Sequence, residues 1–345
     1  MTWYLFKLFI HKISFFGLTF ARLSMMNFRF NILLFLLLIA LVSSCRKDRI
    51  SILLEELSTP TNAILYDITF TDIDTGYVVG GFHWQYGEWL RTIDGGDTWR
   101  SDTFAYTAML GIHIGSTGKA LAVGFDGNAH YKINTASSWQ NYYPPEQETI
   151  NALDFYDENT GVAVGGKNFE YGVIYRFSDM KGSADTVYYP LNHELRDVQF
   201  TDKNTVHTVG YGYVARSLDG GFTWQANSIQ GDFFFALDFP TSEVGYAVGR
   251  SGTIIKTTNA GKDWTKLRNG NNLFVSNEKF RDVLFKNEGE GYIIGDAGLF
   301  WVTRDGGDSW EIVENTPDVT FNRLFYQNGR GYIAGEAGKI YRFAD

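Results

Sequence analysis

The chain has 345 residues and carries 39 Asp and Glu against 30 Lys and Arg, a net charge of −9 at pH 7. This balance excludes nucleic acid or another strongly anionic surface as the partner, because no basic stretch is large enough to neutralise phosphates. Glycine (37 residues) and aromatic residues (17%) are frequent. No sustained helical apolar period occurs after residue 50, so an all-β fold is expected.

Residues 1–45 have the features of a signal peptide. They contain four Lys and Arg but no Asp or Glu, and an apolar run at residues 31–44 leads into Cys45. Such a run is short for a membrane span and normal for a secretory signal. Its small-residue ending before a cysteine is similar to bacterial lipoprotein signals, which predicts lipidation at Cys45 and a true start at Met25 or Met26. The alternative is an uncleaved anchor.

Cys45 is the only cysteine, so an exported form of this chain has no disulfide. Residues 46–49 then form a short polar tether, and residues 50–345 one domain. Removal of residues 1–45 leaves 26 Lys and Arg against 39 Asp and Glu, a net charge of −13. Arg46, rather than Asp, follows the cysteine, and by resemblance to known sorting signals this favours the outer over the inner membrane. We expect an extracytoplasmic protein in the cell envelope that contacts the membrane only through its lipid.

The clearest copy of an internal repeat spans residues 245–267 and reads GYAVGRSGTIIKTTNAGKDWTKL. A short apolar run between two glycines predicts a buried strand, and two further strands follow, separated by a glycine-containing turn. An apolar stretch at residues 234–239 supplies a fourth strand upstream. Four strands in about 40 residues are typical of one β-propeller blade.

The glycine that ends the apolar strand recurs at positions 80, 124, 165, 210, 249, 295 and 335, at spacings of 39 to 46 residues. The sequence therefore predicts an all-β, seven-bladed β-propeller of four-stranded blades. Two alternating residues of each innermost strand are expected to pack on neighbouring blades, from Ile68 and Phe70 in the first unit to Arg323 and Phe325 in the seventh.

The seventh unit stops before its outer strand. Residues 50–60 align with residues 311–317, and both stretches lead into a first strand at a similar distance. We therefore expect an N-terminal strand within residues 50–57 to complete the last blade, which closes the ring and removes an exposed strand edge. The alternative is a loose tail.

A turn that begins with Asp or Asn and ends with Trp recurs in five units, and in all of them except the Asn134 turn it contains glycine. The Asx side chain is expected to accept turn amides, glycine to take positive φ, and Trp to cover the turn. The third unit, near Asp179, lacks the Trp. The predicted structural residues are Asp94 and Trp99, Asn134 and Trp139, Asp219 and Trp224, Asn259 and Trp264, and Asp305 and Trp310.

The recurring pattern GYAVG-x-x-GTIIKTT-x-x-G-x-x-W resembles the photosystem II stability/assembly factor propellers over residues 50–345. The turns alone resemble the Asp-box, or BNR repeat, of sialidases and some polysaccharide hydrolases. The first resemblance implies a non-enzymatic scaffold that binds a protein during assembly. Nothing in the sequence points to a photosystem as the partner.

Propeller sites normally lie at one end of the central channel, and the Asp-box turns fall at the other end. Aromatic residues and arginines at the expected mouth suit a protein or peptide partner, or a glycan. As an alternative, the Arg196–Asp197 and Arg281–Asp282 pairs form ion-pair ladders between blades. The candidate binding residues are Tyr66, Trp84, Tyr86, Asp126, Asn151, Arg196, Asp197, Arg250, Arg281, Asp282, Asp296 and Glu336.

A carbohydrate-active hydrolase is the alternative function. Asp296 and Glu336, on adjacent blades, are a possible glycosidase carboxylate pair. Sialidases, however, have six blades and an F-R-I-P-type strand, and this sequence has seven units and no such tetrapeptide. The histidines show no metal-ligand spacing and no phosphate-binding loop opens a helix. We therefore expect a monomeric binding protein without metal, cofactor or catalysis.

Overall fold

The computed structural model describes residues 48–142, 144, 147–167, 170–181, 184–187 and 193–344. The predicted signal peptide, the predicted lipidation site Cys45 and the start of the predicted tether lie outside these residues. Contacts group residues 49–345 into one unit. Within the described part of the chain, no helix is both long and apolar enough to cross a membrane.

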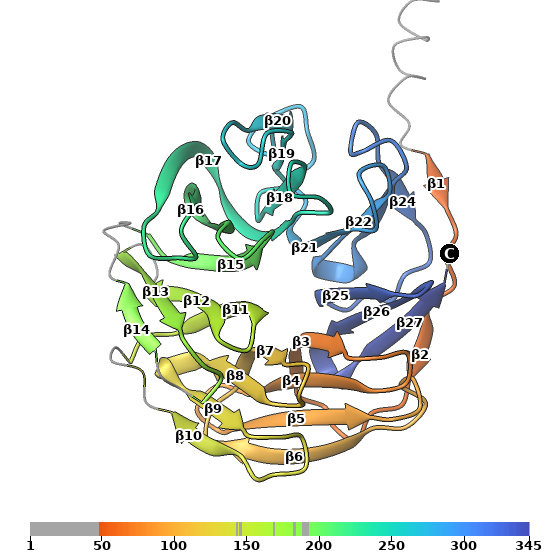
Figure 1. Cartoon of the computed structure of the whole chain (residues 1–345). Coiled ribbons are helices and arrows are strands. Elements are labelled where there is room, and N and C mark those ends of the chain that lie inside the picture. Colours follow the sequence, from red (N-terminus) through yellow and green to blue (C-terminus); the bar gives the residue numbers. More distant parts are fainter. Residues whose placement is uncertain are drawn as a thin grey trace, which may run out of the picture. The chain divides into compact units, whose positions relative to one another are not determined.

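Three sheets are four-stranded antiparallel meanders in chain order. They are β3–β6 (Ile64–Phe70, Gly76–Phe82, Tyr86–Thr92, Arg100–Ala105), β7–β10 (Met109–Ile114, Ala120–Gly124, Ala129–Lys132, Gln140–Tyr142) and β11–β14 (Ile150–Asp157, Thr160–Lys167, Tyr171–Phe177, Ala184–Val187). Each begins with the strand nearest the centre of the molecule (Figure 1).

A fourth sheet joins six strands through two unusually long ones. β16 pairs with β15 through residues 206–210 and with β17 through residues 211–216. β17 likewise pairs with β16 through residues 225–228 and with β18 through residues 234–238. Gly212 and Gly231, in the middle of these strands, have positive φ. The strands are β15 (Leu195–Phe200), β16 (Val206–Ser217), β17 (Gln225–Asp238), β18 (Gly245–Gly249), β19 (Ile254–Thr257) and β20 (Thr265–Arg268).

The N-terminal segment pairs with two sheets in succession. β1 runs parallel to β24, and β2 runs antiparallel to β27, with Glu55 opposite Arg342 and Leu57 opposite Ile340. The predicted strand therefore covers only the end of residues 50–57, and the parallel pairing of β1 was not foreseen. The two sheets are β1 (Arg49–Ile50) with β21–β24 (Phe280–Phe285, Gly291–Gly295, Phe300–Thr303, Glu311–Val313) and β2 (Glu55–Leu57) with β25–β27 (Phe321–Gln327, Arg330–Gly335, Ile340–Ala344).

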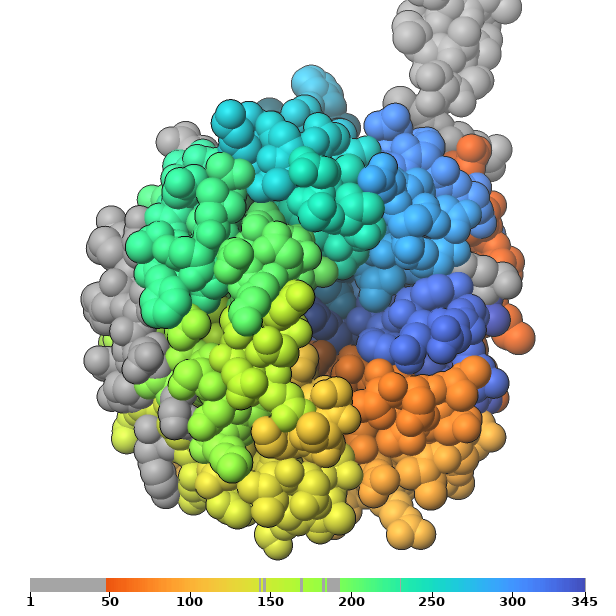
Figure 2. Space-filling model, viewed as in Figure 1, coloured from red at the N-terminus to blue at the C-terminus, as the bar shows by residue number. Residues whose placement is uncertain are grey.

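The sheets of residues 49–345 are arranged around a common centre as in a β-propeller (Figure 1), and a hollow marks that centre in the space-filling view (Figure 2). The apolar core lies between neighbouring sheets. For example, Tyr246 of β18 stacks on Phe285 of β21 with ring centroids 3.6 Å apart, and Phe70 of β3 stacks on Tyr332 of β26 at 4.1 Å. The fold is therefore all-β and propeller-like.

The predicted register of the seventh unit is wrong by one residue. A bulge between Phe321 and Arg323 makes Leu324 the partner of Ile333, and Leu324 is buried in the core while Tyr326 packs against it. Arg323 faces the centre of the molecule instead. By register, Leu324 and Tyr326 correspond to Ile68 and Phe70 of the first sheet, so Leu324 rather than Arg323 packs in the core. Phe325, as predicted, does pack on a neighbouring sheet, with its ring centroid 5.5 Å from that of Phe70.

The recurring glycine at the end of the second strand permits a close contact, with a backbone carbonyl oxygen in six units and with the Asp232 side chain at Gly249. A Cβ on Gly295 would lie 2.0 Å from the carbonyl oxygen of Lys279, and one on Gly165 would lie 1.9 Å from that of Thr149. In each case the next amide donates a hydrogen bond to the same oxygen, as from Asp296 to Lys279 at 3.1 Å. The glycine thus fixes the residue that follows the second strand beside the start of the innermost strand.

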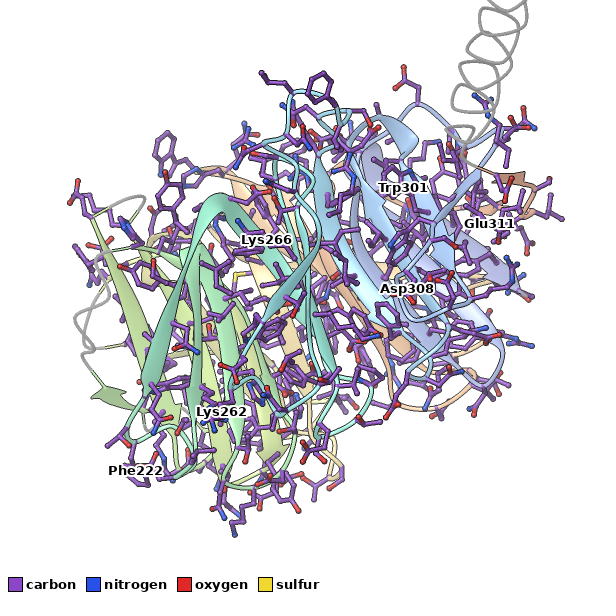
Figure 3. All side chains as sticks on the ribbon, turned by 90° about the horizontal axis from the view of Figure 1, so that it is seen from above. Phe222, Lys262, Lys266, Trp301, Asp308 and Glu311 are labelled. Carbon is purple, nitrogen blue, oxygen red and sulfur yellow. The ribbon has the colours of Figure 1, made fainter. Side chains whose placement is uncertain are left out.

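The turn at Asp219 illustrates the Asp-box geometry. Ser217 donates its hydroxyl to Oδ1 of Asp219 at 2.8 Å, and Thr223 donates its amide to Oδ1 at 2.8 Å and its hydroxyl to Oδ2 at 2.6 Å. Trp224 donates to the Gly221 carbonyl at 3.1 Å. Phe222 of this turn and Lys262 of the Asn259 turn point outward at one end of the molecule, with Lys266 of β20 further along (Figure 3).

Similar bonds recur at Asp94, Asn259 and Asp305, where a Thr hydroxyl two residues earlier also donates to the Asx side chain. Hydrogen bonds from Thr98 lower the pKa of Asp94 to about 2. Asn134 has a reduced set, since it accepts only the amides of Ala136 and Ser137. Lys132 stands there in place of the Thr or Ser of the other turns.

Candidate functional site

A pocket of ≈ 330 Å³ lies where the innermost strands meet. Four arginines line it, so we call it the arginine pocket. Its polar and charged lining consists of Arg196, Arg250, Arg281, Arg323, Tyr66, Asn151, Asn322, Asp67 and Asp197. Five predicted residues that are not buried meet here: Tyr66, Asn151, Arg196, Arg250 and Arg281.

A β-bulge in each innermost strand aims one side chain at this pocket. Each strand shifts register across a single residue, for instance Arg196 between Leu195 and Asp197 and Arg281 between Phe280 and Asp282. Such a bulge redirects the extra residue away from the sheet face. All of these bulged residues line the arginine pocket: Tyr66, Leu110, Asn151, Arg196, Phe235, Arg281 and Asn322.

Arg196 is held between an acid and two aromatic rings. Its Nη2 lies 3.3 Å from Oε2 of Glu194, and its guanidinium lies 5.0 Å from the ring centroid of Phe233 and 5.2 Å from that of Phe235. Burial lowers the pKa of Arg196, and the charges of Arg250 and Arg281 act in the same direction. Arg250 and Arg281 therefore repel the Arg196 guanidinium, against the attraction of Glu194, and an anion among the three would reduce this repulsion.

Arg281 and Arg250 differ in their partners. Arg281 donates from Nε to Oδ1 of Asp296 at 2.6 Å. Among the described residues, no carboxylate lies within ion-pair distance of Arg250. The Arg250 amide donates to the Phe233 carbonyl at 2.9 Å, so its backbone is fixed while its exposed side chain reaches the pocket. Arg250 is thus the arginine best able to pair with a ligand.

Asp197 and Asp282 are both buried, and of the two only Asp197 lines the arginine pocket. Their exposure is 2% and 3%, and each accepts a backbone amide from the neighbouring innermost strand: Leu237 at 3.0 Å and Leu324 at 2.6 Å. They pair with Arg323 rather than with Arg196 or Arg281. Successive residues in a strand point to opposite sides. The arginine of each Arg–Asp pair therefore points into the pocket, and the aspartate points into its wall.

Sequence reasoning missed the central position of Arg323 and the contribution of Asp67. The Arg323 side chain lies 3.4 Å from both Asp67 and Asp197 and 3.5 Å from Asp282. These four residues occupy equivalent positions after the bulge in their strands. An alignment of the repeats with the bulge included would therefore have found the set.

Two further aspartates extend this acidic ring one pleat along the innermost strands. Asp154 accepts the Phe200 amide at 2.7 Å and Asp238 accepts the Phe285 amide at 2.6 Å, so these carboxylates also link neighbouring sheets. Burial raises the pKa of Asp154, Asp238 and Asp282 to about 7, against the lowering effect of Arg323 and the amides. The aspartates serve to join sheets around one central cation.

An aromatic cluster stands beside the arginine pocket. The Trp84 side chain, 76% exposed, donates from Nε1 to Oδ2 of Asp126 at 3.1 Å, and His83 lies 3.2 Å from the same oxygen. His83 stacks on both Trp84 and Phe125, and Phe125 lies edge-on to Tyr66 at 6.2 Å. The predicted residues Trp84 and Asp126 thus meet, together with their chain neighbours His83 and Phe125.

Tyr86 contributes to the hairpin rather than to the cluster. Its ring lies edge-on to that of Phe82, its partner across the turn between β4 and β5. Burial raises the pKa of Tyr66, the Arg281 charge opposes this rise, and the Glu336 charge adds to it.

The geometry does not favour Asp296 and Glu336 as a glycosidase pair. Asp296 accepts from Arg281 and also lies 3.7 Å from Lys279, so its carboxylate is held by two cations. Both acids begin short 3₁₀ turns after second strands, Asp296–Gly298 and Glu336–Gly338.

Over the described ranges, no group of three or more His, Cys, Asp or Glu is placed to hold a metal.

Comparisons with known proteins point to one family. The model of the family described as "Photosynthesis system II assembly factor YCF48" matches residues 179–277 and 274–344, slightly less than half of the chain. The photosystem II assembly lipoprotein Ycf48 of Synechococcus sp. (strain CC9902) is 30% identical over 132 residues, 33% of this chain and 35% of that protein. The chain thus aligns with about a third of this relative's length.

A longer alignment and a solved structure extend the likeness. The photosystem II assembly lipoprotein Ycf48 of Parasynechococcus marenigrum (strain WH8102) is 23% identical over 327 residues, 86% of this chain and 91% of that protein. The structure "YCF48 bound to D1 peptide" superimposes with a TM-score of 0.68 at 17% identity, covering 87% of this chain and 97% of the other. At that identity, the structural likeness shows the fold alone.

These relatives in sequence are assembly factors and not hydrolases. Strand pattern, fold and sequence comparisons agree: the chain is a β-propeller similar to the photosystem II assembly factors.

Proposed function

We propose that this chain is a non-enzymatic binding scaffold that recognises a carboxylate-bearing protein or peptide segment at the arginine pocket. The observation that carries the proposal is the convergence of Arg196, Arg250 and Arg281 on one hollow of an otherwise acidic protein. Guanidinium groups bind carboxylates through paired, charge-assisted hydrogen bonds. The name of a structurally similar protein, which mentions a bound peptide, is in keeping with this class of ligand.

The exposed Trp84 gives such a contact an apolar anchor beside the charges. Aromatic and arginine side chains at the centre of an interface carry most of its binding energy. A glycan is the second ligand class that aromatic rings and arginines suit, but the mutual repulsion of three guanidiniums favours a ligand with negative charge. The partner is therefore a peptide segment rich in Asp or Glu, or a chain end.

We also propose a seven-bladed architecture. β16 and β17 each combine two strands of the repeat, so the six-stranded sheet counts as two four-stranded blades. The pairing of β2 with β27 then completes the last blade and closes the ring. Lipidation at Cys45 and an extracytoplasmic, preferably outer-membrane, location of a monomer complete the proposal, and the lipoprotein names of the relatives support the anchor.

A charge-reversal experiment tests the binding site. Partners captured from cell-envelope extracts by the full chain are identified, purified and titrated against wild type and the double variant Arg196→Glu/Arg281→Glu. Because both contacts are partly desolvated, the double variant is expected to bind more weakly by at least ~2 kcal/mol, or about 30-fold.

The matched control reverses two exposed lysines near the Asp-box turns, Lys203→Glu and Lys262→Glu, and changes the net charge equally. The control is expected to retain affinity within about threefold, apart from a salt-dependent long-range effect. Equal losses in both variants would assign the effect to net charge, and an unchanged affinity of the arginine variant would place the binding face elsewhere.

A further inference from the structure

A second hollow of ≈ 640 Å³ adjoins the arginine pocket and shares Arg250 with it. We call it the aromatic pocket. Its lining includes His193, Tyr211, Tyr213, Phe233 and Asn271. The volume lies in the range of roughly 300–1,000 Å³ that is usual for ligand pockets.

The long strands β16 and β17 create this hollow. Tyr211 of β16 lies opposite Phe233 of β17, and Tyr213 lies opposite Ser228. One residue separates these paired positions on β16, but four residues separate them on β17, and these four bulge out of the sheet. The bulge opens a space flanked by rings. The His193 ring centroid lies 5.0 Å from that of Tyr211 and 5.4 Å from that of Tyr213.

The wall between the two pockets is both rigid and shared. Asp232 accepts the amides of Ser251 and Thr253 at 2.8 and 2.9 Å, which fixes the turn that carries Arg250. The Arg196 guanidinium lies over Phe233 on this wall. A ligand held by Arg196 and Arg250 therefore lies directly beside the aromatic rings.

One residue of the aromatic pocket has a buried polar atom that is unpaired in the described part of the chain. Nδ1 of His193 is buried and has no hydrogen-bond partner within the described residues. An unpaired buried ring nitrogen costs free energy unless a ligand or water pairs with it.

An exposed apolar loop tip belongs to the same region. Asn271 of the pocket is in the loop between β20 and β21, and two residues further on Leu273 and Phe274 are 97% and 96% exposed. The Phe274 amide donates to Oδ1 of Asn272 at 3.0 Å, and Arg268 donates to the Ser276 and Gly252 carbonyls. Folding therefore shapes this loop but leaves both apolar side chains in water, which is typical of an interaction site.

We propose that the aromatic pocket and the Leu273–Phe274 tip hold an aromatic side chain of the same peptide segment whose carboxylate enters the arginine pocket. The inference rests on the proposed function and adds a second recognition element to it. Tyr211, Tyr213 and Phe233 offer ring contacts, and the loop tip covers the outer side of the bound ring. A peptide with a carboxylate and an aromatic residue at a fixed spacing satisfies both pockets at once.

Random peptides displayed on phage, selected on the full chain in mild detergent, test this inference. Wild type is expected to enrich peptides that combine Asp or Glu with Phe, Tyr or Trp at a recurrent spacing. Two variants should weaken the contact with the peptide's aromatic side chain: Tyr211→Ser in the aromatic pocket, and Leu273→Ser/Phe274→Ser on the loop. Because Leu273 and Phe274 are almost fully exposed, the loop variant should fold as the wild type does. The matched control is Ile93→Ser/Phe222→Ser, two side chains 65% and 55% exposed near the Asp-box turns.

Titration of an enriched synthetic peptide separates the two elements. Both variants are expected to bind it at least tenfold more weakly than wild type or the control. Replacement of the peptide's aromatic residue by Ala should weaken binding to wild type tenfold but barely change binding to the loop variant. No aromatic preference, or unchanged affinity in both variants, overturns this inference alone. Loss of the acidic preference, with no response to Arg196→Glu/Arg281→Glu, overturns the proposed function instead.

Discussion

Replacement of Arg323 by Met should destabilise the protein in a pH-dependent way. Arg323 is the central cation for Asp67, Asp197 and Asp282, at 3.4 to 3.5 Å. Each contact corresponds to about 5 kcal/mol of Coulomb energy at an effective dielectric constant of about 20, and desolvation of the guanidinium opposes much of it. Removal of one partner of a buried ion pair typically costs about 3–5 kcal/mol; because the Arg323 side chain is 35% exposed while Asp197 and Asp282 are buried, we expect a cost near the lower end, about 3 kcal/mol. We expect this cost at pH 8.

The cost should fall as the pH is lowered. The pKa of Asp154, Asp238 and Asp282 is raised to about 7, so the folded state holds protons that the unfolded state has released. Their contribution to stability is fully present below the unfolded pKa and is lost as the pH rises through the folded pKa. Without Arg323 these pKa values rise further. The difference between variant and wild type therefore shrinks by up to about 1.4 kcal/mol per pH unit for each extra proton bound.

Urea unfolding of the chain from residue 46 at pH 5, 6, 7 and 8 measures this difference. Burial lowers the pKa of His113 and His130 to about 4 and that of His207 to about 3, so these residues reduce stability as the pH falls below about 6.5. They act in both proteins and cancel in the difference, apart from His113 beside Asp154. Arg250→Met, an exposed arginine of the same pocket, is the control and should cost less than about 0.5 kcal/mol. A cost for Arg323→Met that is equal at pH 5 and pH 8 would refute the reasoning.

Three further predictions concern the anchor, the N-terminal strand and the recurring glycine. A clickable fatty acid should label wild type but not Cys45→Ser, and equal labelling of both would exclude lipidation at this cysteine. A chain that begins at residue 61 loses the pairing of β2 with β27 and should be several kcal/mol less stable than one that begins at residue 46; thermal midpoints within about two degrees would make residues 50–57 a linker. Gly295→Ala brings a Cβ to 2.0 Å from the Lys279 carbonyl and should lower the free energy of unfolding, measured in urea, by about 3 kcal/mol or more. In the control Gly289→Ala the nearest atom is at 3.4 Å, and the cost should be less than about 1 kcal/mol. Similar costs for both variants would show that the backbone moves to make room for the Cβ.

The sequence alone was sufficient for the all-β, propeller-like fold. Its evidence was local and repeated: apolar strands between glycines, Asx–Gly–Trp turns and a spacing of about 40 residues. A pattern that recurs in every unit is independent of long-range contacts, since backbone hydrogen bonds and turn conformations depend on neighbouring residues. The repeat also predicted that five pocket residues lie together, because corresponding positions of different blades meet at one end of the axis. These residues are Tyr66, Asn151, Arg196, Arg250 and Arg281.

Only the tertiary structure decided which neighbour of each Arg–Asp pair enters the pocket. Arg196 and Arg281 occupy the bulges, whereas Asp197 and Asp282 turn into the wall and accept amides of the next strand. The period of a strand does not reveal a one-residue bulge, which reverses the side on which the following residues lie. Arg323 follows the bulge of its strand and lies at the axis, in the position that Asp67, Asp197 and Asp282 occupy in theirs, rather than in the expected packing position.

The aromatic pocket and the acidic ring also depend on tertiary structure. Asp67, Asp154, Asp197, Asp238 and Asp282 are far apart in the sequence, and their charges act together only because five innermost strands converge on Arg323. The aromatic pocket exists because four residues of β17, but only one residue of β16, lie between two successive paired positions of these strands. Repeats in a sequence determine what each blade is, but the meeting of side chains from different blades at the axis requires the geometry of the whole domain.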